Sequence, residues 1–305
     1  MVISIVAAVA TALANASSNV LNRKAARDEP DRVAFRLRLI LDLLRNRTWL
    51  IAVSLMLLSF VLGAVALGTG VLAAVQTIII LELPMTLIGG VWLLGGHLGK
   101  REWLSIAAMT AGVVGFLLCL DPRAGGQPAV PALAWIIGSA VCGGLLLAAF
   151  LAARAARNPA RRAALLGIAC GLAYGLAAAY VKGMTQQFSS GGIVGVLAAW
   201  QLYAGAVAGL VGTWLLENAY HAGRLAAAQP GITLVDPLVA TLWGVLAFGE
   251  HVRGGPVLAV AAAPLAVLAA GVFLLSRSPV LQSAAGGRES GQPRERTGDA
   301  AGSPS

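Results

Sequence analysis

The sequence predicts an all-α protein that spans a membrane several times, as its composition and its charge pattern both indicate. Hydrophobic residues make up 58% of the 305 residues and charged residues only 11%, whereas a water-soluble domain carries about 25% charged residues. The charges lie in short clusters between apolar runs of about twenty residues, and a helix of that length crosses the hydrocarbon core of a bilayer. We therefore expect a polytopic membrane protein.

About nine transmembrane helices are expected from the apolar runs. The first run has no Lys or Arg before it, and eight basic residues follow it between Arg23 and Arg47. A signal peptide carries its charge in front, so we expect this helix to be retained. After Ser276 the sequence turns polar and rich in Gly, Ser and Arg, which predicts a disordered cytoplasmic tail at 277–305. The expected spans are residues 1–22, 48–68, 71–97, 102–120, 131–153, 163–186, 193–216, 225–248 and 255–276.

The formal net charge of +9 indicates membrane orientation rather than a nucleic acid partner. Basic residues are retained on the cytoplasmic side during insertion. If the N-terminus is outside, nineteen of the 22 Lys and Arg residues fall in cytoplasmic loops or the tail, and Arg123, Lys182 and Arg253 fall outside. We therefore expect the N-terminus outside and the C-terminus in the cytoplasm. The Ala- and Gly-rich composition suggests a bacterium with a GC-rich genome, so the expected location is the bacterial plasma membrane.

An internal repeat becomes visible when the sequence is shifted by 153 residues. GVLAAVQTIIILELP at 70–84 then aligns without a gap on GRLAAAQPGITLVDP at 223–237, with Gln and Pro at matching positions. By the expected orientation the two copies enter the membrane from opposite sides, as in the inverted repeats of secondary transporters. This predicts a transmembrane domain at 1–276, built from two inverted four-helix repeats. The parts are repeat one at 1–121, a connector at 122–153 and repeat two at 154–276.

The repeat unit resembles the EamA-type repeat of the drug/metabolite transporter superfamily. It has a Gln near a helix start, a Pro in mid-helix and a Gly-Glu end at Phe248-Gly249-Glu250. The nine-span count and the basic stretch Asn22-Arg23-Lys24 are similar to the NIPA-like branch of proposed magnesium transporters. The first repeat departs from the pattern, because Gly96-His97 stands where Gly-Glu is usual. The resemblance covers about residues 1–276 and implies transmembrane transport of an unspecified substrate.

Two acidic residues, Glu82 and Asp236, lie near the middle of an expected span. A charge at the bilayer centre costs about 2.5–3.5 kcal/mol on insertion scales, so such residues face a cavity or a partner. Gln229, Thr233 and Asp236 fall at i, i+4 and i+7 on one helix face, and Gln76 matches Gln229 in the other repeat. On a continuous helix Glu82 would point about 100° away from that face. Asp236 is therefore the preferred cation or proton site, and the alternative for both acids is a structural polar clamp.

Prolines follow both acids closely, Pro84 after Glu82 and Pro237 after Asp236. A mid-helix proline removes a hydrogen bond and frees the carbonyl four residues earlier, here that of Ile80 and that of Thr233. Carbonyls at broken helices hold cations in transporters. Pro84 and Pro237 are therefore candidate hinges, with a simple packing kink as the alternative.

Polar and aromatic residues complete the set of candidates. In the first helix Asn15, Ser18, Asn19 and Asn22 form a polar stripe, which fits either pore lining or interhelical hydrogen bonding. In the second half Tyr174 and Gln201 are candidate binding residues. Tryptophans at the ends of expected spans are interpreted as interfacial anchors, namely Trp49, Trp103, Trp135 and Trp214.

The sequence contains no nucleophile elbow, P-loop, HExxH or CxxC motif, so we expect neither an enzyme nor a bound cofactor. The favoured function is a secondary transporter that moves a small polar or cationic solute by alternating access. The alternatives are a magnesium-type channel or facilitator, and a non-transporting membrane scaffold. The expected partners are the lipid bilayer and a small-molecule or cation substrate. The metal, if there is one, and the choice between monomer and homodimer stay open.

Overall fold

The computed structural model of the chain describes residues 2–27, 47–94, 97–125, 130–222, 225–253 and 256–277. Helices account for nearly all of these residues, and in these ranges β structure is limited to an isolated bridge between Arg123 and His251. Most of the predicted tail, residues 278–305, lies outside the described ranges. The helices are α1 (Val2–Arg27), α3 (Arg47–Thr69), α4 (Leu72–Ile79), α5 (Glu82–Leu94), α6 (Lys100–Leu120), α7 (Ala132–Ala155), α8 (Pro159–Ala198), α9 (Trp200–Ala222), α10 (Leu225–Leu246) and α11 (Pro256–Ser276).

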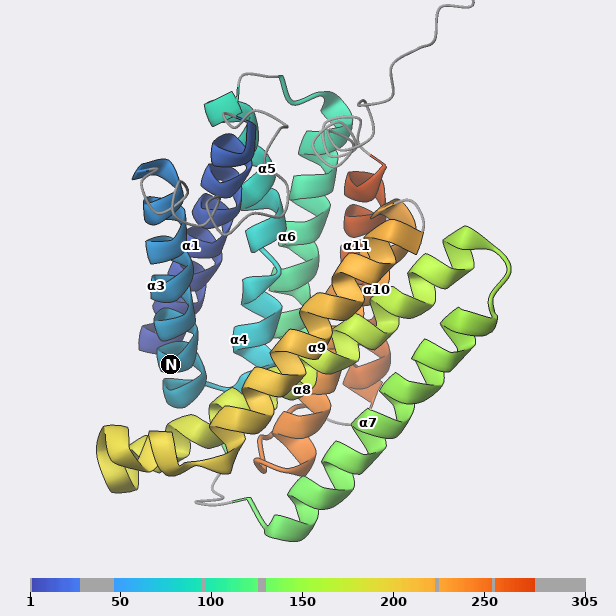
Figure 1. Cartoon of the computed structure of the whole chain (residues 1–305). Coiled ribbons are helices and arrows are strands. Elements are labelled where there is room, and N and C mark those ends of the chain that lie inside the picture. Colours follow the sequence, from blue (N-terminus) through green and yellow to red (C-terminus); the bar gives the residue numbers. More distant parts are fainter. Residues whose placement is uncertain are drawn as a thin grey trace, which may run out of the picture.

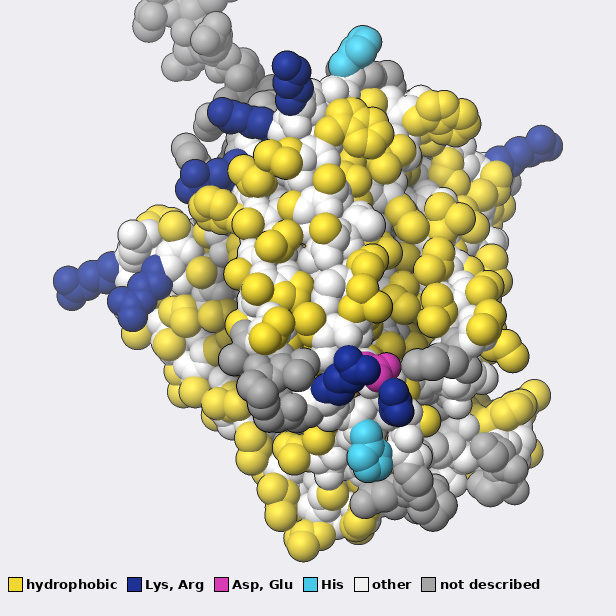
Figure 2. Space-filling view, turned by 180° about the vertical axis from the view of Figure 1, so that it is seen from behind, with side chains coloured by type: hydrophobic (Ala, Val, Ile, Leu, Met, Phe, Trp, Pro, Cys, Tyr) yellow, Lys and Arg dark blue, Asp and Glu magenta, His cyan; other side chains and the backbone are white. Residues whose placement is uncertain are grey.

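The expected fold class, a helical membrane protein, is confirmed. Six helical segments in the described part of the chain are long and apolar enough to cross a bilayer, or seven if one bent pair is counted as a span. Hydrophobic side chains cover the middle of the face in Figure 2, while most Lys and Arg side chains lie toward its margins. The six segments are Val2–Asn22, Arg47–Thr69, Leu72–Leu93, Lys100–Leu120, Ala132–Ala155 and Pro159–Phe188.

The finer count of nine spans stays a prediction. The bent pair joins Gly191–Ala198 to Trp200–Ala222 at 54°, so the expected span 193–216 is divided between two helices. α10 is not among the six candidate spans. α11 contributes the shorter apolar segment Val260–Ser276, which is part of the helix Pro256–Ser276.

The helices pack in two groups around a central set (Figure 1). α1 and α3 form one side, and α7, α8 and α9 form the other. α4, α5, α10, α6 and α11 lie between them, with α6 packed along α11 and α4 against α10. The close α6–α11 contact depends on glycine, because a Cβ at Gly112 would lie 2.7 Å from the Cβ of Leu268.

The two helices that carry the sequence repeat differ in regularity. Two turn residues, Ile80 and Leu81, separate α4 from α5, and Leu81 is three residues before Pro84. Ile80 keeps right-handed helical dihedral angles, and Leu72–Leu93 forms one candidate span. α10 stays helical through Pro230 and Pro237.

Candidate functional site

A central cavity of about 1010 Å³ lies among α1, α3, α4, α5, α8, α9 and α10. It brings together residues from both predicted repeats, although some of them are more than two hundred positions apart in the sequence. Every candidate binding residue from the sequence lines it except Gln201. These lining residues are Asn15, Asn19, Gln76, Glu82, Tyr174, Gln229, Thr233 and Asp236.

Glu82 is held by the polar stripe of α1. Asn15 donates through Nδ2 to Oε2 of Glu82 at 3.0 Å, and Asn19 donates through Nδ2 to Oε1 at 2.7 Å. Their i, i+4 spacing puts both amides on one face of α1, so each carboxylate oxygen has its own donor. The other two members of the stripe lie elsewhere, because Ser18 donates to the carbonyl of Ala52 at 2.7 Å and Asn22 faces Ser18.

Asp236 is held from the other predicted repeat. Gln76 of α4 donates through Nε2 to Oδ1 of Asp236 at 3.2 Å. Gln229 and Thr233 share the lining face of α10 with Asp236, and Gln229 Nε2 lies 3.5 Å from the Thr233 hydroxyl. α8 approaches this part of α10 closely, since a Cβ at Gly175 would lie 2.9 Å from the carbonyl oxygen of Asp236. Contacts on both sides of α10 therefore fix the position of this carboxylate.

Glu82 lines the same cavity as Gln76, contrary to the expected separation. Neighbouring helix residues point about 100° apart, but the cavity lining includes both Glu82 and its neighbour Leu83, the residue that matches Asp236 in the repeat. The carbonyl of Ile80, which Pro84 was expected to free, accepts the Leu83 amide at 3.1 Å. A hinge role for Pro84 and Pro237 stays a prediction.

The cavity is acidic. Glu82 and Asp236 are its charged side chains, and no Lys, Arg or His belongs to the described lining. The Tyr174 hydroxyl, 3.3 Å from the Thr213 hydroxyl, lies within electrostatic reach of both carboxylates. One turn after Glu82, the Thr86 hydroxyl is buried without a hydrogen-bond partner. The arrangement offers carboxylate, hydroxyl and amide oxygens to a positively charged solute.

Gln201 belongs to a different environment. It lines a smaller cavity of about 470 Å³ together with Trp135, Tyr180 and Trp200. Trp135 stacks on Tyr180 with ring centroids 5.4 Å apart, and it contacts Trp243 at 5.0 Å. The interpretation of Trp135 as an interfacial anchor is wrong, because its side chain is buried in this aromatic cluster. Trp103 and Trp214 are exposed, as interfacial anchors would be.

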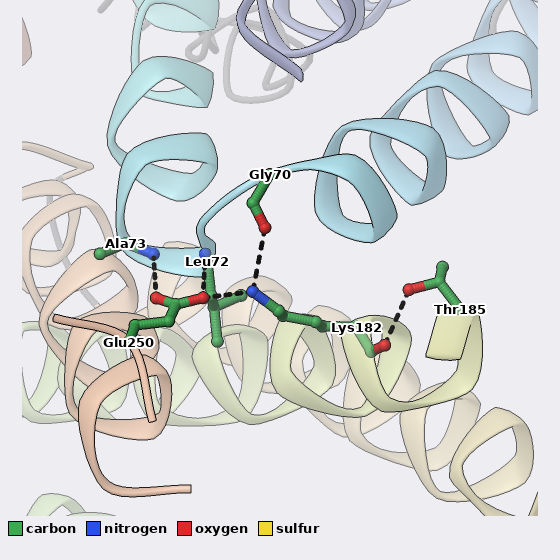
Figure 3. Close-up of polar contacts among 6 residues, drawn as sticks. All are labelled: Gly70, Leu72, Ala73, Lys182, Thr185 and Glu250. Carbon is green, nitrogen blue, oxygen red and sulfur yellow. Dashed lines mark hydrogen bonds and ion pairs between the residues drawn. The ribbon is translucent and has the colours of Figure 1, made fainter. Parts of the chain in front are cut away.

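Sequence reasoning missed a buried ion pair between Lys182 and Glu250 (Figure 3). Lys182 was counted on the outer side of the membrane, near the end of the expected span 163–186, and it lies within α8 with its side chain almost fully buried. The Glu250 carboxylate accepts the backbone N–H of Leu72 at 2.7 Å, at the first residue of α4. The Gly-Glu signal at 249–250 marked this position without indicating its partner.

α4 and α10 run in opposite directions. The first residue of α4 contacts Glu250, which follows the end of α10, and one turn further along α4 Gln76 reaches Asp236 in the middle of α10. At the same end of the molecule an exposed group joins the turns after α6 and α10. Asp121 there pairs with Arg123 at 2.7 Å and Arg253 at 3.2 Å. The hydrogen bond from Arg123 holds the pKa of Asp121 below its usual value.

These features define a helical membrane protein with an acidic cavity among its helices. The chain is 28% identical over 253 residues to an uncharacterised protein of Corynebacterium glutamicum, and the alignment covers 81% of this chain and 85% of that protein. No protein-family model and no solved structure matches the chain. Membership of the drug/metabolite transporter superfamily therefore stays a prediction.

Proposed function

We propose that this protein is a secondary transporter that carries a small cationic solute across the membrane by alternating access. One observation carries the proposal. Two half-buried carboxylates, one from each predicted repeat, face a single cavity whose described lining holds no basic side chain. Intramembrane acids are expensive to insert and mark ion or substrate pathways. A solute that brings positive charge would balance them.

The positions of the helices support the inverted repeat that alternating access requires. The 153-residue shift carries the bounds of α3, Arg47–Thr69, onto those of α9, Trp200–Ala222. It also carries Leu72, the first residue of α4, onto Leu225, the first residue of α10. The antiparallel course of α4 and α10 is the relation expected for two copies of opposite orientation.

The cavity extends along much of the length of the helices. Toward one end its lining reaches Gly90 and Tyr220, close to the ends of α5 and α9, and Gln229 near the start of α10. Toward the other end it includes Leu67, near the end of α3, while on α4 and α8 it ends at Gln76 and Val181. With the N-terminus outside, the first of these ends would face the cytoplasm.

Binding in the cavity would proceed by exchange of partners. An ammonium group that reached Glu82 or Asp236 would form a charge-assisted hydrogen bond, which is stronger than the bond from a neutral amide. The amide of Gln76 or of the α1 asparagines would then be released from its carboxylate. A solute shifts the conformational equilibrium only by its difference in affinity for the two states, and this exchange provides such a difference. The gradient that drives it would be one of protons or of the solute itself.

The proposal is tested by flux into proteoliposomes with an imposed proton gradient, with tetraethylammonium, n-butylammonium and Mg²⁺ as probes. We expect gradient-dependent flux of an organic cation, which Asp236→Asn abolishes. Glu217→Gln is the matched control, because Glu217 is an exposed acid on α9 away from the cavity. Glu82→Gln, assigned mainly to stability by the sequence argument, should also weaken uptake because Glu82 faces the cavity.

The same assay separates the alternatives. Mg²⁺ flux that is independent of the proton gradient would replace the carrier proposal with a magnesium-type channel or facilitator. Folded protein that moves none of the three probes, with or without the gradient, would favour the membrane scaffold. Equal flux in wild type and Asp236→Asn would remove the cavity from the mechanism.

A further inference from the structure

The ion pair of Lys182 and Glu250 joins three segments that are far apart in sequence (Figure 3). Lys182 belongs to α8, Glu250 follows α10, and both contact the turn between α3 and α4. The Lys182 ammonium group donates to the carbonyl of Gly70 at 3.0 Å, while Glu250 accepts the amides of Leu72 at 2.7 Å and Ala73 at 3.5 Å. We call these residues the polar latch.

The backbone after α10 is shaped to deliver Glu250. Gly249 has φ +64°, a left-handed conformation that glycine adopts without strain, and the Glu250 amide donates to the carbonyl of Gly244 at 2.8 Å. Gly244 leaves space for the carboxylate, because a Cβ there would lie 2.1 Å from Oε2 of Glu250. The Lys182 ammonium also lies 5.1 Å from the ring centroid of Phe248, within cation–π range.

The latch lies directly beside one end of the cavity. Val181 lines the cavity and Lys182 is the next residue. α4 connects the two regions, since Leu72 at its start binds Glu250 and Gln76 one turn later binds Asp236. α4 has eight residues, and two turn residues, Ile80 and Leu81, separate it from α5. The hold on its start therefore positions Gln76 against Asp236.

We propose that the polar latch is the gate at this end of the cavity, and that it positions α4 so that Gln76 meets Asp236. The gate role rests on the proposed transport function. In the closed state Glu250 and Lys182 neutralise each other away from water. In the open state α4 separates from Glu250, and water hydrates both charges. A solute that displaces Gln76 from Asp236 removes the second hold on α4 and favours this opening.

A buried ion pair suits a gate because its closed state is only weakly favoured. The attraction between the charges largely offsets their loss of hydration, whereas a single charge left behind is strongly destabilising when buried. The latch therefore predicts effects of opposite sign. Glu250→Gln leaves Lys182 without its counter-charge and should open this end. Lys182→Met with Glu250→Gln removes both charges, keeps an acceptor for the Leu72 amide, and should close it again.

The test is the labelling rate of a cysteine at Ala178, which lines the cavity one turn before Lys182. Cys119, Cys142 and Cys170 are first replaced by alanine. A membrane-impermeant maleimide is added to right-side-out and to inside-out vesicles, and an exposed cysteine at Ala124 marks the latch end. We expect slow labelling from the latch end in the latch-intact protein, a rise of about tenfold or more in Glu250→Gln, and slow labelling again in the double variant.

Gly244→Ala gives the same test without any change of charge, should Glu250→Gln fold poorly. The added methyl group must displace the Glu250 carboxylate, so labelling from the latch end should rise. Gly143→Ala is its control, because a Cβ at Gly143 meets nothing within 4 Å. Equal labelling of the latch-intact protein from both ends would overturn the gate, as would unchanged rates in both Glu250→Gln and Gly244→Ala. The labelling experiment uses no transport substrate. A failure of the flux assay would therefore leave the labelling result unchanged.

Discussion

Replacing the two asparagines that donate to Glu82 should measure how much these hydrogen bonds contribute to the free energy of unfolding. Asn15→Leu and Asn19→Leu keep side-chain size but remove the donors to Oε2 and Oε1 of Glu82, at 3.0 and 2.7 Å. We expect the double variant to have a changed affinity for a cationic probe and a lower free energy of unfolding than the wild type. Each single variant should show part of the effect, because each leaves one oxygen with its donor.

The protonation state of Glu82 determines the magnitude. A hydrogen bond to a charged group contributes about 1.5–3 kcal/mol, so loss of both donors to an ionised Glu82 should cost about 3–6 kcal/mol of unfolding free energy. Interhelical hydrogen bonds between neutral groups in membranes average about 0.6 kcal/mol, so a protonated Glu82 predicts a loss of about 1 kcal/mol. The asparagine on the more exposed side, Asn19, should contribute the smaller share.

The assay is reversible unfolding in mixed detergent micelles, measured for the double variant in the wild-type and in a Glu82→Leu background. If the amides act through Glu82, their replacement should matter in the first background and change stability by less than about 0.5 kcal/mol in the second. Equal losses in the two backgrounds would refute the reasoning, since the asparagines would then stabilise the protein through other contacts.

Three further outcomes follow from the structure. Exposed cysteines at Ala124 and Arg157 should be labelled by an impermeant reagent from opposite sides of the membrane, Arg157 from the cytoplasm; labelling from one side would contradict the expected topology. Gly112→Ala should lower the unfolding free energy by about 1–3 kcal/mol, because the new Cβ would lie 2.7 Å from Leu268. Gly143→Ala has open space around it and should leave the unfolding free energy unchanged. Equal stability of the two variants would argue against the α6–α11 contact. Gln201→Leu should leave the affinity for a cationic probe unchanged, since Gln201 lies outside the central cavity, and a large loss of affinity would place it on the pathway.

Much of the architecture could be predicted from apolar runs, because a helix is the simplest way to satisfy backbone hydrogen bonds in lipid. The cost of placing acids and amides in lipid also directed attention to Glu82, Asp236 and the α1 stripe. Which of these residues meet could not be predicted. The pairing of Asn15 and Asn19 with Glu82 depends on how α1 packs against α5.

Other errors concerned the width of the cavity and the partners of charged residues. The angular argument set Glu82 aside, yet both Glu82 and its neighbour Leu83 line the cavity. Lys182 was counted on the outer side, near the end of the expected span 163–186, and no partner was expected for it. Its buried partner, Glu250, lies 68 positions away in the sequence, and no local pattern connects them. A signal was present in the Gly-Glu pair at 249–250, where a flexible residue precedes an acid.

The contrast between Glu250 and the two cavity acids bears on what the protein does. Glu250 shows how this fold stabilises a carboxylate permanently, with a lysine and backbone amides in a closed environment. Glu82 and Asp236 have neutral amides as donors and an open cavity beside them. A purely structural clamp would gain most from a built-in cation, as at Lys182. We therefore propose that the solute or a proton brings the balancing positive charge, which would leave again when the carboxylates return to their amide partners.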